Sequence, residues 1–183
     1  MNLLTLLQQY ARIALLMAKP QDLPAGAHQM LTGIVLCAIT YVLAVASIDG
    51  VLRAIAQAFI EIGLTGLLFW VGLSIVNRSA RFAQAFGGLC GANAMLQIVA
   101  IPVFMGGNGA EFTAIGAFSQ FFLIVWSLSL LGHVFRHTFE TSIPVSIAVA
   151  FLFFIFTMAL LTALIPPPMP QTALLQAAGV WVV

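Results

Sequence analysis

The first turns of the chain alternate apolar and polar positions with the period of an amphipathic helix. Within residues 3–18 the polar positions share one face, and they are Thr5, Gln8, Gln9 and Arg12. The opposite surface carries Leu4, Leu7, Ile13 and Leu16. Lys19 and Pro20 end the pattern. We expect residues 1–28 to form an amphipathic helix in the membrane interface followed by a proline-containing linker. The alternative is a partly buried helix of the bundle.

Long apolar segments follow, and each is close to the roughly 20 residues that cross a bilayer core. They cover residues 29–48, 54–77, 83–105, 112–135 and 142–165. The pattern predicts an all-α fold, a polytopic helical membrane protein with five transmembrane helices in one bundle over residues 29–165. The prolines after Ile165 cannot continue a helix. Residues 166–183 are therefore expected to form a proline-rich break and a short apolar tail on the outer side.

The cations set the expected orientation. If the N-terminus is cytoplasmic, five of the six basic residues fall on the cytoplasmic side: Arg12, Lys19, Arg78, Arg81 and Arg136. Only Arg53 falls outside, so the positive-inside rule predicts a cytoplasmic N-terminus and a periplasmic C-terminus. We expect Arg78, Arg81 and Arg136 to be cytoplasmic anchors. The short loops and lack of sorting tails favour a bacterial inner membrane.

Composition supports a chain that is soluble in lipid. Hydrophobic residues make up 62% of the chain and charged residues 6%, whereas a soluble domain carries roughly a quarter charged residues. The net charge of +1 provides no basic surface for nucleic acid. Cys37 and Cys90 lie in apolar runs without a CxxC partner, which is typical of buried, inert thiols.

Glu61 is the acid that lies well inside a predicted span, about 12 Å from its outer end at 1.5 Å per residue. The same count in the other spans gives polar residues at similar depth: Tyr41 with Thr40, Gln97, Gln120 with Ser119, and Thr157. We expect one polar layer in the outer half of the membrane. It indicates either a polar cavity or proton site, or hydrogen bonds from Glu61 to Gln97 or Gln120 that hold the bundle together.

Two further groups of residues have simpler interpretations. Ala83, Gly87 and Gly91 form a small-residue ridge on the third span, which favours close helix packing within the bundle or between protomers. His133, His137 and Glu140 share a helical face at a spacing compatible with metal. Interfacial anchoring at a helix C-terminus explains this group without metal, and we expect none.

Catalytic motifs are missing from the sequence. No Ser-His-Asp arrangement, paired carboxylates or HExxH occurs, and the polar residues are scattered. We therefore expect a protein that is not an enzyme and that uses no cofactor.

The order of these features resembles the Yip (Ypt/Rab-interacting) family in its divergent bacterial branch. The resemblance covers about residues 10–165 and has three parts: Met17-Ala18-Lys19-Pro20; the basic loop Arg78-Ser79-Ala80-Arg81-Phe82 through Gly91 with Pro102; and Trp126-Ser127-Leu128 leading to Arg136-His137. The tyrosine- and glycine-bearing signatures of eukaryotic members are absent. Membership would imply five spans, a cytoplasmic N-terminus, and membrane organisation or partner binding instead of catalysis.

The sequence favours a non-enzymatic membrane scaffold or accessory subunit that contacts the lipid bilayer and another integral membrane protein, or a second copy of itself. The first alternative is a small permease or channel-like protein that uses the layer around Glu61. The second is a membrane-shaping protein acting through residues 1–18, which would then be free of protein contacts. A water-accessible path to Glu61 would favour the permease, and a dry, filled bundle with an exposed apolar groove would favour the scaffold.

Overall fold

The structure is a computed structural model that describes residues 2–106 and 114–166. All regular elements in these ranges are helical: α1 (Leu3–Ala14), the 3-10 turn η1 (Pro20–Asp22), α2 (Ala27–Asp49), α3 (Val51–Ile75), the 3-10 turn η2 (Ser79–Arg81), α4 (Phe82–Gly106), α5 (Ala114–Phe139) and α6 (Ile143–Leu164). The five helices α2 to α6 are each long and apolar enough to cross a membrane. The prediction of an all-α, multi-pass membrane protein is confirmed.

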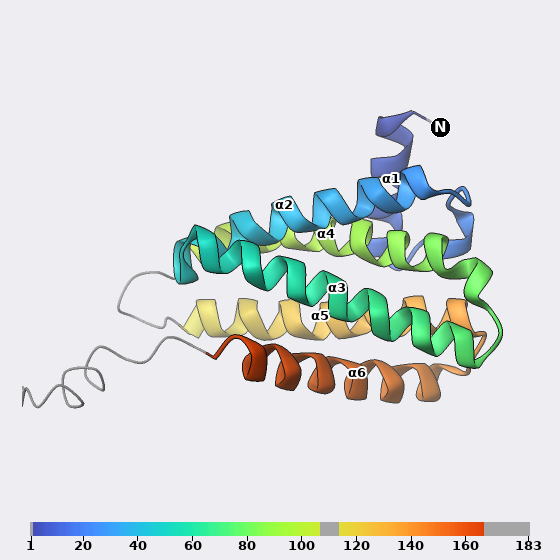
Figure 1. The fold of residues 1–183 in the computed structure, drawn as a ribbon. Helices are drawn as coiled ribbons and strands as arrows, with labels where there is room; N and C mark the ends of the chain where they lie inside the picture. Colours follow the sequence, from blue (N-terminus) through green and yellow to red (C-terminus); the bar gives the residue numbers. More distant parts are fainter. Residues whose placement is uncertain (1, 107–113, 167–183) are drawn as a thin grey trace, which may run out of the picture.

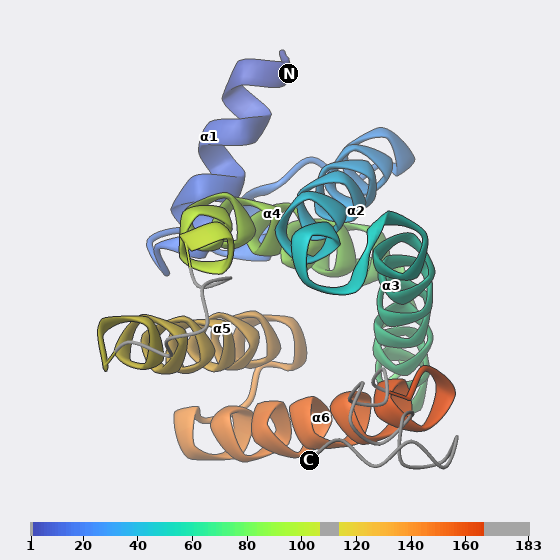
Figure 2. The same ribbon diagram turned by 90° about the vertical axis from the view of Figure 1, so that its left-hand side faces the viewer.

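The five spans run along one common axis (Figure 1). Viewed along that axis, they follow one another around a centre in the order α4, α2, α3, α6 and α5 (Figure 2). The α2–α4 pair is the most extensive helix contact, whereas α3 touches α6 only sparsely. We call the end where α2, α4 and α6 begin the basic end, because Lys19, Arg78, Arg81 and Arg136 lie there.

Short turns connect α2 to α3, α3 to α4 and α5 to α6. Gly50, with φ of +82°, lies between α2 and α3, a conformation that glycine adopts without a Cβ clash. Asn77 and Glu140 both have φ of +55° and follow the ends of α3 and α5. Pro144 occupies the first turn of α6, where its missing N–H removes no helical hydrogen bond. The predicted tail over residues 171–183 lies outside the described residues.

The α2–α4 contact brings the two backbones together without intervening side chains. A Cβ placed on Gly33 would lie 2.5 Å from the carbonyl oxygen of Gly87, and one on Gly87 would lie 2.7 Å from the Cα of Met30. The buried side chain of Gln29 donates from Nε2 to the carbonyl of Ala83 at 2.6 Å. The predicted ridge of small residues is thus used inside the bundle. We call this contact the glycine seam.

Helix α1 is packed against the bundle, and this corrects the predicted orientation of its faces. The residues it buries are Leu6, Tyr10, Ile13 and Ala14. The predicted apolar residues Leu4 and Leu16 are instead exposed, at 65% and 40%. The packing fits the alternative of a partly buried helix, because the apolar stripe of α1 pairs with α4. The membrane-shaping alternative required residues 1–18 to be free of protein contacts, and this requirement is not met.

The side chain of Tyr10 explains why α1 packs against α4. Its ring fills the space that a side chain at Gly91 would need, and its hydroxyl donates to the backbone oxygen of Gln29 at 2.5 Å. Burial raises the pKa of Tyr10 to about 12. Gly33, beside this hydroxyl, lies about 9 Å along α2 from its start, and Gly91 about 14 Å along α4. Helix α1 therefore crosses the spans near the basic end (Figure 1), and its position in the membrane interface stays a prediction.

Candidate functional site

The centre of the bundle contains a cavity with two adjoining chambers, whose largely apolar wall carries several polar side chains. The inner chamber has a volume of about 100 Å³ and the outer chamber about 280 Å³. Both are lined by Tyr41, Glu61, Asn93, Ser127, Phe154 and Met158. These residues come from α2, α3, α4, α5 and α6, so every span contributes to the wall. We call the two chambers together the central cavity.

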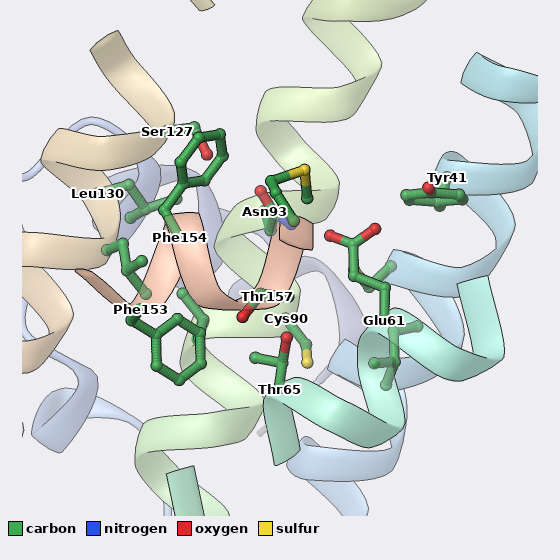
Figure 3. Close-up of a pocket in the computed structure, with 15 residues that line it drawn as sticks. Tyr41, Glu61, Thr65, Cys90, Asn93, Ser127, Leu130, Phe153, Phe154 and Thr157 are labelled. Atoms are coloured by element: carbon green, nitrogen blue, oxygen red, sulfur yellow. The ribbon is translucent and has the colours of Figure 1, made fainter. Parts of the chain in front are cut away.

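Glu61 is positioned by α3 and points toward α2. Its carboxyl group interacts with the side chain of Tyr41, and Figure 3 shows both side chains in the wall of the cavity. Hydrogen bonds from Glu61 to Gln97 or Gln120 were one of the two alternatives that the sequence left open. No such bond occurs in the described structure, in which the carboxyl interacts with Tyr41 on α2.

The two glutamines of the predicted layer line the outer chamber together with Glu61. The hydroxyl of Thr40 donates to Oε1 of Gln97 at 2.6 Å, which joins α2 to α4. Gln120 is exposed, so the outer chamber reaches the surface of the bundle beside α5. The structure therefore brings Glu61, Gln97, Gln120 and Tyr41 to one cavity.

Thr157 completes the predicted set in the inner chamber, and its hydroxyl has no hydrogen-bond partner in the described structure. The residue is 4% exposed. Thr162 on the same helix bonds back to the carbonyl of Met158 at 2.8 Å, whereas Thr157 makes no such bond. A buried hydroxyl without a partner costs about 1–3 kcal/mol. Thr157 therefore offers a donor and an acceptor to a molecule in the chamber.

Several residues of the cavity wall were missed by sequence reasoning. They are Cys37, Thr65, Cys90, Asn93 and Ser127. Three of them lie one helical turn from a predicted residue: Cys37 from Tyr41, Thr65 from Glu61, and Asn93 from Gln97. A search at i ± 4 around the predicted layer would have found these three.

At the basic end, Glu140 does not join the two histidines. Its carboxylate accepts hydrogen bonds from Arg78 and Arg81, each at 2.6 Å, which ties the α5–α6 turn to the α3–α4 turn. Arg81 and Arg78 lower the pKa of Glu140 through these bonds. His133 contacts the backbone oxygen of Ala18 at 2.9 Å. No group of three metal-ligating side chains occurs within the residues that the structure describes.

Comparison with known proteins gave no match: no family model, no curated protein and no solved structure is similar to this chain. The resemblance to the Yip family accordingly stays a prediction from the sequence.

Proposed function

We propose that the protein is a small permease or channel-like membrane protein whose central cavity binds a small solute. The observation that carries the proposal is the cavity itself, in which polar side chains from all five spans converge and the Thr157 hydroxyl lacks a partner. Intramembrane ionisable residues usually mark a pathway or a binding site. A cavity beside Glu61 also favours this function over the scaffold, which called for a filled bundle.

The lining indicates the class of solute. Glu61 is the one charged residue in the described wall of either chamber, and it is an acid. Hydroxyl and carboxamide groups surround it, while Phe153 and Phe154 supply apolar surface in the inner chamber. A site with one carboxyl group and neutral hydrogen-bonding groups suits a proton or a small organic cation such as an alkylammonium ion.

The same proposal includes an orientation of the protein in the membrane, which is based on the charges at the basic end. Lys19, Arg78, Arg81 and Arg136 lie on one side of the bundle, which the positive-inside rule assigns to the cytoplasm. In this orientation the N-terminus is cytoplasmic, the membrane is a bacterial inner membrane, and the outer chamber opens toward the periplasmic half.

The scaffold function has less support from the geometry. Helix α2 presents the apolar stripe Leu31, Val35, Ile39 and Leu43, each more than half exposed. Lipid chains satisfy such a stripe without a protein partner, so the stripe does not identify a binding surface. A membrane partner that copurifies in a fixed ratio would support the scaffold function instead.

Flux measurements on purified protein in proteoliposomes test the proposal, with protons and methylammonium as the two probes. We expect wild-type flux above that of empty liposomes, and Glu61→Gln to lower it by about tenfold or more because a charge-assisted interaction is lost. The matched control is Glu140→Gln, the same change at the exposed basic end, which should retain flux. Size-exclusion profiles show whether both variants remain folded. Equal flux in wild-type and empty liposomes for both probes would contradict the proposal.

A further inference from the structure

The wall of the inner chamber includes both cysteines of the chain, which lie on neighbouring helices. Cys37 lies on α2 and Cys90 on α4, and each is 4% exposed. The two side chains are close enough to interact, and both are free thiols. Both residues belong to the wall of the inner chamber, beside Glu61 and Thr157.

The glycine seam brings the two cysteines close to each other. Cys37 lies one turn after Gly33, and Cys90 lies between Gly87 and Gly91. Because the two backbones meet at Gly33 and Gly87, the cysteines approach from helices that are as close as helices can pack. A disulfide requires Cα atoms about 4.4–6.8 Å apart, a separation that two spans reach only at such a contact.

We propose that Cys37 and Cys90 are a redox-active dithiol that closes to a disulfide, with a lipid-soluble quinone in the central cavity as the electron acceptor. This inference goes beyond the proposed solute binding and does not depend on it. A planar, conjugated and uncharged ring with two carbonyl oxygens matches the chamber, because Phe153 and Phe154 offer ring contacts and the Thr157 hydroxyl is free to donate.

The reaction balances with the quinone as oxidant. Both S–H bonds break, one S–S bond forms between Cys37 and Cys90, and two electrons pass to the quinone. The two protons form the two O–H bonds of the quinol. Glu61 lies close enough to Cys90 for electrostatic interaction, so its carboxyl group is placed to accept a proton during the transfer. The reverse reaction with a quinol or a small dithiol reopens the disulfide.

Thiol counting on the full-length protein in lipid nanodiscs tests the inference. After treatment with a short-chain ubiquinone, the protein is denatured and its free thiols are alkylated with a maleimide. We expect both thiols to be lost together, one quinol to form for each pair of thiols lost, and both thiols to return on reduction. Cys37→Ser and Cys90→Ser should each retain their remaining thiol. Two free thiols after quinone treatment, or a disulfide between two chains, would overturn the inference.

A second variant tests whether disulfide closure depends on a quinone bound beside Thr157 or only on the closeness of the two thiols. Thr157→Val should slow closure by the ubiquinone about fivefold, the effect of one lost hydrogen bond, and should leave closure by the small oxidant diamide unchanged. Equal slowing with both oxidants would show that Thr157 acts on the thiol geometry, and would overturn its role toward quinone. Closure with diamide but not with ubiquinone would overturn the quinone as acceptor.

Discussion

The two sides of the bundle differ in how closely their helices pack. At the glycine seam, α2 and α4 approach until backbone meets backbone, and Gly33, Gly87 and Gly91 leave no room for a Cβ. Across the bundle, α3 and α6 touch only sparsely, and the space between them and α4 is the central cavity. The seam derives its stability from close contact, although Oε1 of the buried Gln29 has no partner there. On the other side, the Thr157 hydroxyl lacks a partner and lines a cavity.

This difference shows where a small membrane bundle can place a binding site. One pair of helices packed at glycine contact gives a rigid framework, and the remaining spans are then free to leave a hollow. If the comparison is correct, substitutions of similar size should have unequal effects on the two sides. The following predictions are ordered from the largest expected effect to the smallest.

Gly87→Val should have the largest effect. The added Cβ would lie 2.7 Å from the Cα of Met30, and backbone cannot move aside as a flexible side chain can. We expect a loss of about 3 kcal/mol of stability, measured by thermal unfolding in detergent. The matched control is Gly63→Val on α3, where no atom lies within 4 Å of the added Cβ. Equal destabilisation by the two variants would contradict the division between a tight and a loose side.

Tyr10→Phe probes how firmly α1 is held on the seam. The variant removes the hydrogen bond to the oxygen of Gln29 at 2.5 Å while keeping the ring against Gly91. We expect a loss of about 1 kcal/mol in chemical unfolding.

A pH titration gives an independent check on the same residue. The folded pKa of Tyr10, about 12, is above its ordinary value of 10.0, so the unfolded chain releases this proton first. The contribution to stability should be complete below pH 10 and decrease as the pH rises toward 12. In Tyr41→Phe, Tyr10 is the only tyrosine left, and its near-ultraviolet absorbance reports the titration. A midpoint near 10 in the folded protein would show that Tyr10 is not buried.

Two threonine-to-valine variants compare satisfied and unsatisfied hydroxyl groups. Thr40→Val removes the 2.6 Å bond to Gln97 and should cost about 1 kcal/mol. Thr157→Val replaces a hydroxyl that has no partner, so stability should stay equal or rise by up to about 1 kcal/mol. Thermal unfolding of both variants in the same detergent decides the comparison. A loss at Thr157 as large as that at Thr40 would contradict an unpaired hydroxyl.

Glu140→Gln should have the smallest effect, because its ion pairs with Arg78 and Arg81 are exposed. The melting temperature should fall slightly at neutral pH, and less so at high salt. Since the folded pKa of Glu140 is lowered, its contribution is present above its ordinary pKa of 4.5. It is lost as the pH falls through the folded value. Wild type and variant should therefore unfold alike in strong acid, and a difference that persists there would have another cause.

The sequence was sufficient to predict the five spans, because each is a long apolar run bounded by short polar breaks. Residue counts also predicted that Glu61, Gln97 and Gln120 lie at a similar level along their helices, and all three line the outer chamber. The rotation of each helix about its axis is set by packing and cannot be obtained from residue counts. For this reason the sequence did not show which side chain the Glu61 carboxyl faces, and in the structure it interacts with Tyr41.

The orientation of α1 was missed for a related reason. The polar residues of α1 indicated one face, but the buried stripe is set by Tyr10, whose ring needs the gap at Gly91. Nothing within residues 1–28 shows that a glycine on a later span provides this gap. Helical spacing from Leu6 to Tyr10 and Ile13 would have indicated the stripe, although not the helix it packs against.

The seating of Tyr10 on Gly91 has a consequence for biosynthesis. Helix α1 leaves the ribosome before α4, yet α4, the third span, provides the surface that receives it. Helix α1 therefore cannot dock until α4 has been inserted. During that interval its apolar stripe has only the membrane surface or a chaperone to cover it. Docking of α1 thus requires that the first three spans have assembled. A protease that reaches the N-terminus would cleave an undocked α1 and would thereby distinguish the unfinished chain from the finished one.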